Sequence, residues 1–273
     1  MTLGTLRRLI RGAARWQTAA LTLPLVLASV SPASAGPPFL TDDPEPVDYQ
    51  HFEFYTFSTR DKAADGGTAT LGPAFEYNVG ALPNLQVHLV VPYAWSGSPG
   101  TSGLGDTEVG LKYRFVQQTK AAPEIGIFPM AELATGNAND GLGNGRTWFR
   151  LPVWIQKNIG AWTTYGGGGV ALNAAPGMKN YAFGGWLVQR DFGERWTLGG
   201  EIFANGAQTV DGTQSTFYNV GGYFKPSDRF NVLFSVGHTV SGAGHAIAYF
   251  GLYWTGGPAS RGDEPALRDA NLP

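Results

Sequence analysis

The sequence contains no cysteine, little charge and, after its first 35 residues, no long apolar run. The lack of cysteine excludes disulfides, thiol nucleophiles and cysteine-bound metals. Charged residues make up only 15% of the chain, and an ordinary soluble domain needs more to cover its surface. The net charge of −2 comes without a basic stripe, so we expect no nucleic-acid partner. Because no later apolar run reaches helix-spanning length, the remainder can enter a membrane only as strands.

Glycine and aromatic residues are abundant instead. The chain has 39 Gly, 8 Trp, 11 Tyr and 16 Phe. A disordered chain would lack these aromatic residues. A membrane barrel explains both counts, because one face of each strand meets lipid and glycines relieve crowding in a closed sheet.

Residues 1–35 have the features of a secretory signal peptide. Four arginines at positions 7–15 precede an apolar run over 19–30, and Ala33-Ser34-Ala35 is a small-residue cleavage site. An uncleaved N-terminal anchor is the alternative, but the apolar run is too short to span a bilayer as a helix. The absence of cysteine also excludes a lipoprotein anchor.

The remainder divides into three parts. Residues 36–47 are rich in Pro and Asp and predict an extended leader in the periplasm. Residues 48–255 predict one barrel domain. Residues 256–273 are polar and without periodicity, and they predict a flexible periplasmic tail.

Within the barrel domain the sequence predicts about twelve strands of roughly ten residues, the length that a tilted strand needs to cross a membrane. They lie near 48–59, 69–79, 84–95, 105–116, 123–134, 146–158, 161–172, 180–191, 194–206, 214–225, 229–240 and 245–254. The fold class is therefore all-β, a transmembrane antiparallel up-and-down barrel. The glycine run 166–169 has no phosphate-loop context, and we expect it to let a strand bend or Trp186 pack over it.

The links between these segments alternate in length. Long polar links follow the first, third, fifth, seventh and ninth segments, whereas most of the others are short, and the final link at 241–244 departs from the rhythm. Outer-membrane barrels show this pattern, with long loops outside the cell and tight turns in the periplasm. An even strand number then leaves both chain ends in the periplasm.

Alternating side chains predict two different faces for several strands. In 84–95 the odd positions from Leu85 to Tyr93 are apolar, while Gln86 and His88 occupy the other face. A soluble sandwich or lipocalin-like barrel would turn the apolar face inward. Low charge and aromatic residues near segment ends favour lipid outside. Those aromatic residues are Tyr49, Tyr93, Trp95, Trp148, Trp162, Trp196, Tyr253 and Trp254.

Two motifs resemble a known family. The stretch GPPFLTDDPEPVDYQHFEFY at 36–55 and GLGDTEVGLKYRF at 103–115 are similar to outer-membrane barrels grouped as transporters of the meta-pathway of phenol degradation. The resemblance covers roughly residues 37–254, and Thr41-Asp42-Asp43-Pro44 and Gly105-Asp106 are its most telling parts. It implies an outer-membrane location and uptake of small, aromatic or hydrophobic compounds. The chain departs from the usual barrel ending, because a tail follows Tyr253-Trp254.

The polar face supplies the candidate functional residues. As a pore lining, mixed charges would order water and select polar solutes; as a structural network they would pair and close the interior. Twelve strands give a backbone diameter of roughly 24 Å and an opening of about 10 Å at most. The lumen-lining candidates are Glu53, Glu76, His88, Glu108, Lys112, Arg114, Glu124, Glu132, Arg150, Gln156, Glu201 and Asn205, with His51 as a polar neighbour.

The interpretation that we favour is a passive channel for small molecules, not an enzyme, without cofactor or metal. Its partners would be outer-membrane lipid, a small solute and the barrel-assembly machinery. One alternative is a closed structural or adhesive barrel. A weaker one is a lipid-modifying enzyme using His238 and Ser241, which lack an acidic partner at suitable spacing. His238 and His245 flank one loop and are a weak metal candidate.

Overall fold

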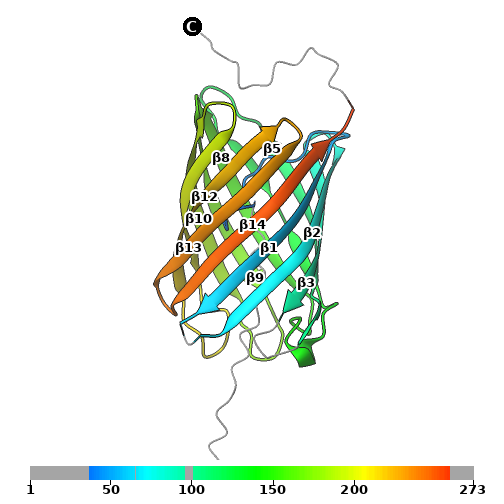
Figure 1. The fold of residues 1–273 in the computed structure, drawn as a ribbon, viewed down its shortest axis with the longest axis vertical. Helices are drawn as coiled ribbons and strands as arrows, with labels where there is room; N and C mark the ends of the chain where they lie inside the picture. Colours follow the sequence, from blue (N-terminus) through cyan, green and yellow to red (C-terminus); the bar gives the residue numbers. More distant parts are fainter. Residues whose placement is uncertain (1–36, 65, 96–100, 259–273) are drawn as a thin grey trace, which may run out of the picture.

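The computed structural model describes residues 37–64, 66–95 and 101–258, and it is a closed antiparallel β-barrel (Figure 1). The predicted signal peptide and residues 259–273 of the tail lie outside the described residues. None of the helices in the described ranges is long and apolar enough to span a membrane. The elements are β1 (Phe52–Ala63), β2 (Thr68–Leu82), β3 (Leu85–Trp95), β4 (Ser102–Leu104), β5 (Thr107–Val116), β6 (Glu124–Ile127), β7 (Met130–Leu133), the 3₁₀ turn η1 (Ala138–Asp140), β8 (Trp148–Ile159), β9 (Trp162–Leu172), β10 (Tyr181–Phe192), β11 (Trp196–Asn205), β12 (Ser215–Ser227), β13 (Phe230–Ser241) and β14 (His245–Gly256).

These elements form twelve barrel strands. β4 and β5 both pair with β3 and are two parts of one strand, interrupted at Gly105-Asp106. β6 and β7 both lie between β5 and β8 and are likewise one strand, interrupted at Phe128-Pro129. The barrel closes where β1 pairs with β14 along its whole length, from Phe52 opposite Gly256 to Ala63 opposite His245. The predicted all-β fold and its twelve strands are confirmed.

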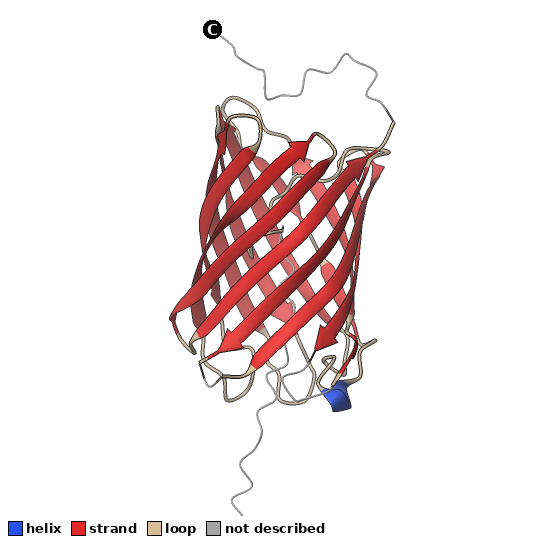
Figure 2. Ribbon diagram, in the orientation of Figure 1, coloured by secondary structure: helices blue, strands red, loops and turns tan. Residues whose placement is uncertain are grey.

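The two ends of the barrel differ in their connections (Figure 2). The links after β1, β3, β7, β9, β11 and β13 meet at one end, the lower one in Figure 1, and the longest of them is 134–147. The other end carries shorter turns such as 83–84, 160–161 and 193–195, and β14 ends there. Gly160 and Gly193 have φ values of 59° and 64°, a left-handed conformation that tight turns require and that glycine adopts without strain. The long and short rhythm is therefore present, including the short final link.

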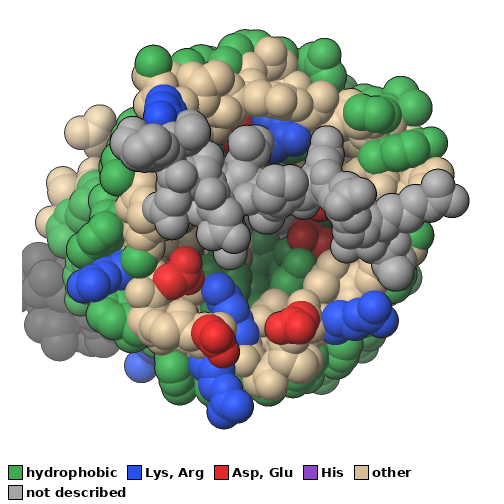
Figure 3. Space-filling model, turned by 90° about the horizontal axis from the view of Figure 1, so that it is seen from above, with side chains coloured by type: hydrophobic (Ala, Val, Ile, Leu, Met, Phe, Trp, Pro, Cys, Tyr) green, Lys and Arg blue, Asp and Glu red, His purple; other side chains and the backbone are tan. Residues whose placement is uncertain are grey.

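The outer face is apolar and the inner face polar, as the alternation predicts. On β3, Val87 and Leu89 are exposed while Gln86 and His88 are buried. Figure 3 looks onto the end that carries the short turns, where hydrophobic side chains form the periphery and charged ones gather around the opening. An apolar exterior of this kind faces lipid, so the barrel is of the transmembrane type.

Our assignment of two of the aromatic residues to the lipid interface is wrong. Trp148 is only 2% exposed and faces inward, and Tyr253 donates a hydrogen bond to Glu53 inside the barrel. Trp95, Trp162 and others remain exposed on the outer wall. Strand ends carry both inward and outward positions, so proximity to an end does not fix the face.

The glycine run on β9 permits close packing. A Cβ on Gly166 would lie 2.3 Å from the Trp186 ring of β10, which no real side chain tolerates. Gly168 lies opposite Gly184 in the pairing of β9 with β10. The prediction that Trp186 packs over this run is confirmed, and a flat glycine strip forms part of the wall.

Candidate functional site

The predicted lumen candidates all lie on the inward positions of their strands. Arg114, Glu53 and Asn205 are less covered than the others, and His51 precedes β1, where its Nδ1 lies 3.1 Å from the Tyr49 carbonyl. Their role in transport stays a prediction. The candidates with buried side chains are Glu76, His88, Glu108, Lys112, Glu124, Glu132, Arg150, Gln156 and Glu201.

A hydrogen-bonded chain of polar groups crosses from β2 to β5. Asn78 donates its amide to Glu76 over 2.7 Å, which directs the Asn78 carbonyl oxygen to His88 Nδ1, also at 2.7 Å. His88 Nε2 lies 2.8 Å from Glu108 Oε1. Both ring nitrogens therefore face acceptor oxygens, an arrangement that a doubly protonated imidazolium satisfies completely.

Arg150 on β8 links this chain to a second carboxylate. Its guanidinium contacts the other oxygen of Glu108 and lies 3.6 Å from Glu132 Oε1. Glu132 is 1% exposed, and within the described part of the chain its carboxylate oxygens have no hydrogen-bond donor. Arg150 is therefore the charge partner that offsets two buried carboxylates on this wall.

The adjoining part of the wall, on β1, β13 and β14, is rich in aromatic side chains. Tyr55 on β1 and Tyr253 on β14 stack with ring centroids 4.5 Å apart, and Phe57 and Tyr249 stack at 5.4 Å. These rings pack around buried Leu233 of β13. Sequence reasoning missed this wall because the segment at 245–254 is apolar on both faces, which leaves no alternation from which to assign a face. The lumen thus carries an aromatic cluster directly beside the buried glutamates, with Tyr55 paired to Glu76 across β1 and β2.

The leader lies in the space that the strands enclose. Leu40 and Thr41 donate their backbone N–H groups to the two oxygens of Glu201, each over 2.7 Å. Lys112 lies 3.0 Å from Asp42 and 3.4 Å from Asp43. The two acids of the Thr-Asp-Asp-Pro motif are therefore the partners of a buried lysine, which could not remain charged there alone.

Further contacts hold the leader along its length. Val47 N–H donates to Gln86, and Gln156 donates to Glu45 over 3.0 Å. The hydroxyl of Tyr223 donates to the Pro37 carbonyl over 2.7 Å, and Phe39 packs on Tyr165 and Leu187.

This placement corrects our expectation of an extended periplasmic leader. Residues 37–47 lie inside the barrel. A segment without regular structure has free backbone N–H groups, and these can donate hydrogen bonds to the lumen carboxylates. Composition did not indicate this location, and residues 37–41 form turns and bends. Lys112 is the residue that could have indicated this location. It faces the lumen, and its two acidic partners are not on neighbouring strands.

The Gly-Asp motif between β4 and β5 holds the loop at 134–147 at the mouth of the barrel. Asp106 accepts hydrogen bonds from the backbone N–H groups of Gly136 at 2.9 Å and Asn144 at 2.6 Å. Leu142 of the same loop is buried against Leu71 and Ala94 of the wall. Leu142 and Asp106 therefore anchor the loop at 134–147 to the barrel mouth, while residues 137–140 remain exposed.

We expect Asp106→Ala to release this loop. The two N–H groups would lose a charged acceptor, so hydrogen exchange at Gly136 and Asn144 should speed up by about tenfold or more. Asp140→Ala is the matched control, because Asp140 lies in the same loop but is exposed, and its carboxylate accepts from the Asn137 side chain. Unchanged exchange in Asp106→Ala would show that the loop is held by Leu142 alone.

The enzyme and metal alternatives gain no support from the geometry. His238 Nδ1 lies 2.7 Å from the carbonyl oxygen of Thr239, and in the described ranges no hydrogen bond joins His238 to Ser241. His245 Nδ1 lies 2.8 Å from Asp61. In the same ranges no cluster of three His, Asp or Glu side chains is arranged to hold a metal ion.

Comparison with known proteins identifies the type of fold. No family model and no curated protein matches the chain. A crystal structure of an outer membrane channel from Pseudomonas putida F1 is similar, with a TM-score of 0.63 and 14% identity, over 78% of this chain and 98% of that one. The KdgM porin follows with a TM-score of 0.51 and 11% identity, over 73% and 98%. The chain therefore has the fold of outer-membrane channel and porin barrels.

Proposed function

We propose that this chain is a passive outer-membrane channel for small molecules. The observation that carries the proposal is the barrel itself, lipid-compatible outside and lined inside by Glu108, Arg150, Lys112 and their neighbours. A barrel that served only as an anchor has no need of so many buried charges, which are costly to desolvate. The channel and porin names of the structures with this fold support the same function.

The aromatic cluster beside the charged groups suggests the class of solute. A small aromatic alcohol or acid can stack on Tyr55 and Tyr249 while its polar group meets the charged groups. This agrees with the resemblance to barrels of the phenol meta-pathway, whose implied substrates are small aromatic compounds. Membership of that family and the substrate class are part of the proposal.

The proposed topology places both termini in the periplasm and the long links outside the cell. After removal of residues 1–35, the barrel-assembly machinery would insert the chain, using Tyr253-Trp254 as an internal end signal. An epitope inserted at Asp211, in the link after β11, should be labelled by antibody on intact cells. One inserted at Gly193 should be labelled only after the outer membrane is permeabilised.

A closed barrel with a structural or adhesive role is the second candidate. The leader favours it because it occupies the interior, and the anchored loop at 134–147 adds buried Leu142 at one mouth. The two candidates differ in whether water and solute pass while the leader is docked.

Reconstitution separates them. A channel should give stepwise conductance in planar bilayers and should speed swelling of liposomes in phenol-sized solutes more than in a disaccharide, given an opening of about 10 Å or less. Protein unfolded by boiling provides the control for leakage. A native barrel that conducts nothing and admits no solute, with the leader either present or removed, would refute the channel proposal.

A further inference from the structure

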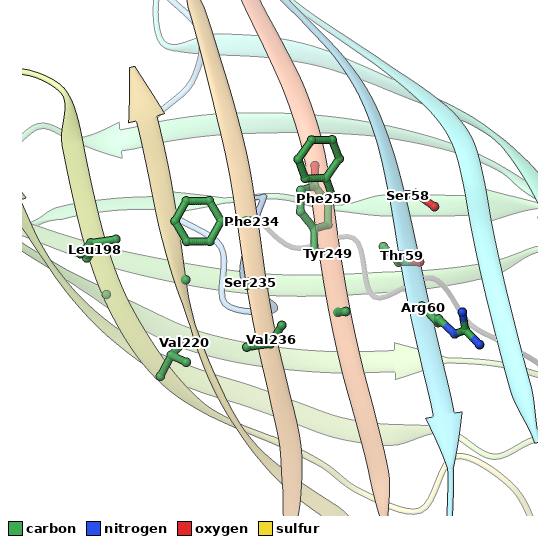
Figure 4. A pocket seen from close by; sticks show the side chains of 13 residues that line it. Ser58, Thr59, Arg60, Leu198, Val220, Phe234, Ser235, Val236, Tyr249 and Phe250 are labelled. Carbon is green, nitrogen blue, oxygen red and sulfur yellow. The ribbon is translucent and has the colours of Figure 1, made fainter. Parts of the chain in front are cut away.

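The outer wall carries a groove that the lumen does not explain. It has a volume of about 550 Å³ and lies over β1, β11, β12, β13 and β14 (Figure 4). One row of side chains across it runs from Val236 through Ala248 to Arg60, as the pairing of β13 with β14 and of β14 with β1 shows. Ala248 is small, so the surface is recessed at the centre of the row. Phe234 and Phe250 lie at one end of the groove.

Two cations stand beside this groove on the same outward face. Arg60 and Lys62 are both exposed and lie two residues apart on β1, so they share a face. Asp61 between them points the other way and contacts His245 Nδ1 at 2.8 Å. Among the described residues neither Arg60 nor Lys62 takes part in an ion pair.

Their depth fits the membrane surface. Lys62 and Arg60 lie one and three residues from the end of β1, at the end that carries the long links. A strand tilted about 40° advances roughly 2.5 Å along the membrane normal per residue. Both cations therefore lie within about 8 Å of the strand end, where lipid-facing charge costs little. The groove extends from them toward the middle of the apolar band.

We propose that this groove binds a phosphorylated, acylated glycolipid of the outer leaflet, with phosphate on Arg60 and Lys62 and an acyl chain over Ala248. Charge complementarity and position identify the ligand, because two cations at the lipid interface, which have no ion-pair partner among the described residues, match a phosphate group. The apolar walls of Val236 and Phe250 match the chain below it. The assignment rests on the proposed topology, in which the long links face outward.

Binding is tested with purified diphosphorylated lipid A added to the detergent-solubilised protein and measured by native mass spectrometry. The wild type should retain the lipid, and Arg60→Gln with Lys62→Gln should weaken binding by about tenfold or more. Arg190→Gln is the matched control, since Arg190 is an exposed arginine that stacks on Trp162 and Phe192 near the opposite barrel end. It should retain the lipid as the wild type does.

A second pair of variants tests the acyl chain separately. Ala248→Trp should fill the groove and lower lipid A binding, whereas Ala182→Trp, at an exposed position on β10, should not. Equal binding by the wild type and the double glutamine variant would overturn the proposal, and so would equal retention of phosphatidylglycerol by the wild type. Conductance should be the same in all these variants because the groove lies outside the lumen. Lipid binding without conductance would refute the channel and leave this site standing.

Discussion

Removing residues 37–47 should raise the single-channel conductance of the barrel by about threefold or more. Without these residues, ions could pass through the full width between the strands. The leader occupies the middle of the lumen and contacts Glu201 and Lys112 through its backbone and its acids. Water would replace these contacts without closing the space. Planar-bilayer recording of the native and shortened chains, refolded side by side, measures the change.

Two further variants separate the leader's contacts from its bulk. Glu201→Ala removes the acceptor for Leu40 and Thr41 and should give frequent transitions to a larger conductance level. Asn205→Ala is its control, because Asn205 faces inward on the same strand without a hydrogen bond to the leader in the described structure. If the shortened chain conducted no more than the native one, the leader would not be the constriction.

Arg150→Ala should be the most destabilising single change in the barrel wall. It would leave Glu108 and Glu132 buried and without their shared cation. Removing one partner from a buried ionic group costs about 3–5 kcal/mol. Urea or guanidinium unfolding of the protein in detergent micelles, followed by the mobility of the folded and unfolded forms on gels, measures the loss.

A second substitution tests this explanation. Glu132→Gln in the Arg150→Ala background should restore part of the stability, because one uncompensated charge is removed. Arg190→Ala should cost little, since Arg190 is exposed and lies over the faces of Trp162 and Phe192 at the surface. An Arg150→Ala protein as stable as the native one would mean that the two glutamates are neutral in the native barrel.

The strands were predictable because each is an extended segment whose two faces meet different solvents. Alternation alone places Val87 and His88 on opposite faces, and the structure agrees. The interruption at Phe128-Pro129 was not predicted, because the flanking residues keep the alternation. At Gly105-Asp106 the alternation shifts, since Leu104 is exposed and Glu108 is buried, and it was missed because the predicted strand began at residue 105. The inward position of Trp148 was missed because the prediction relied on its closeness to a strand end and not on its place in the alternation.

The site was predictable only in part. Parity identified Glu108, Arg150 and Glu201 as inward-facing, because it needs only the local chain. The contact of Lys112 with Asp42 joins positions 70 residues apart, and no local pattern records which segment enters a barrel. The same holds for Asp106, whose motif was recognised but whose partners in the loop at 134–147 were not.

The position of the leader has a consequence for biogenesis. Its contacts come from strands spread over the whole barrel, from Gln86 on β3 through Lys112 on β5 to Tyr223 on β12. The leader is synthesised before any of these strands, yet its binding site exists only once they have come together. It must therefore remain unattached during insertion, and its docking would be the final step of assembly and a natural reporter of a completed barrel.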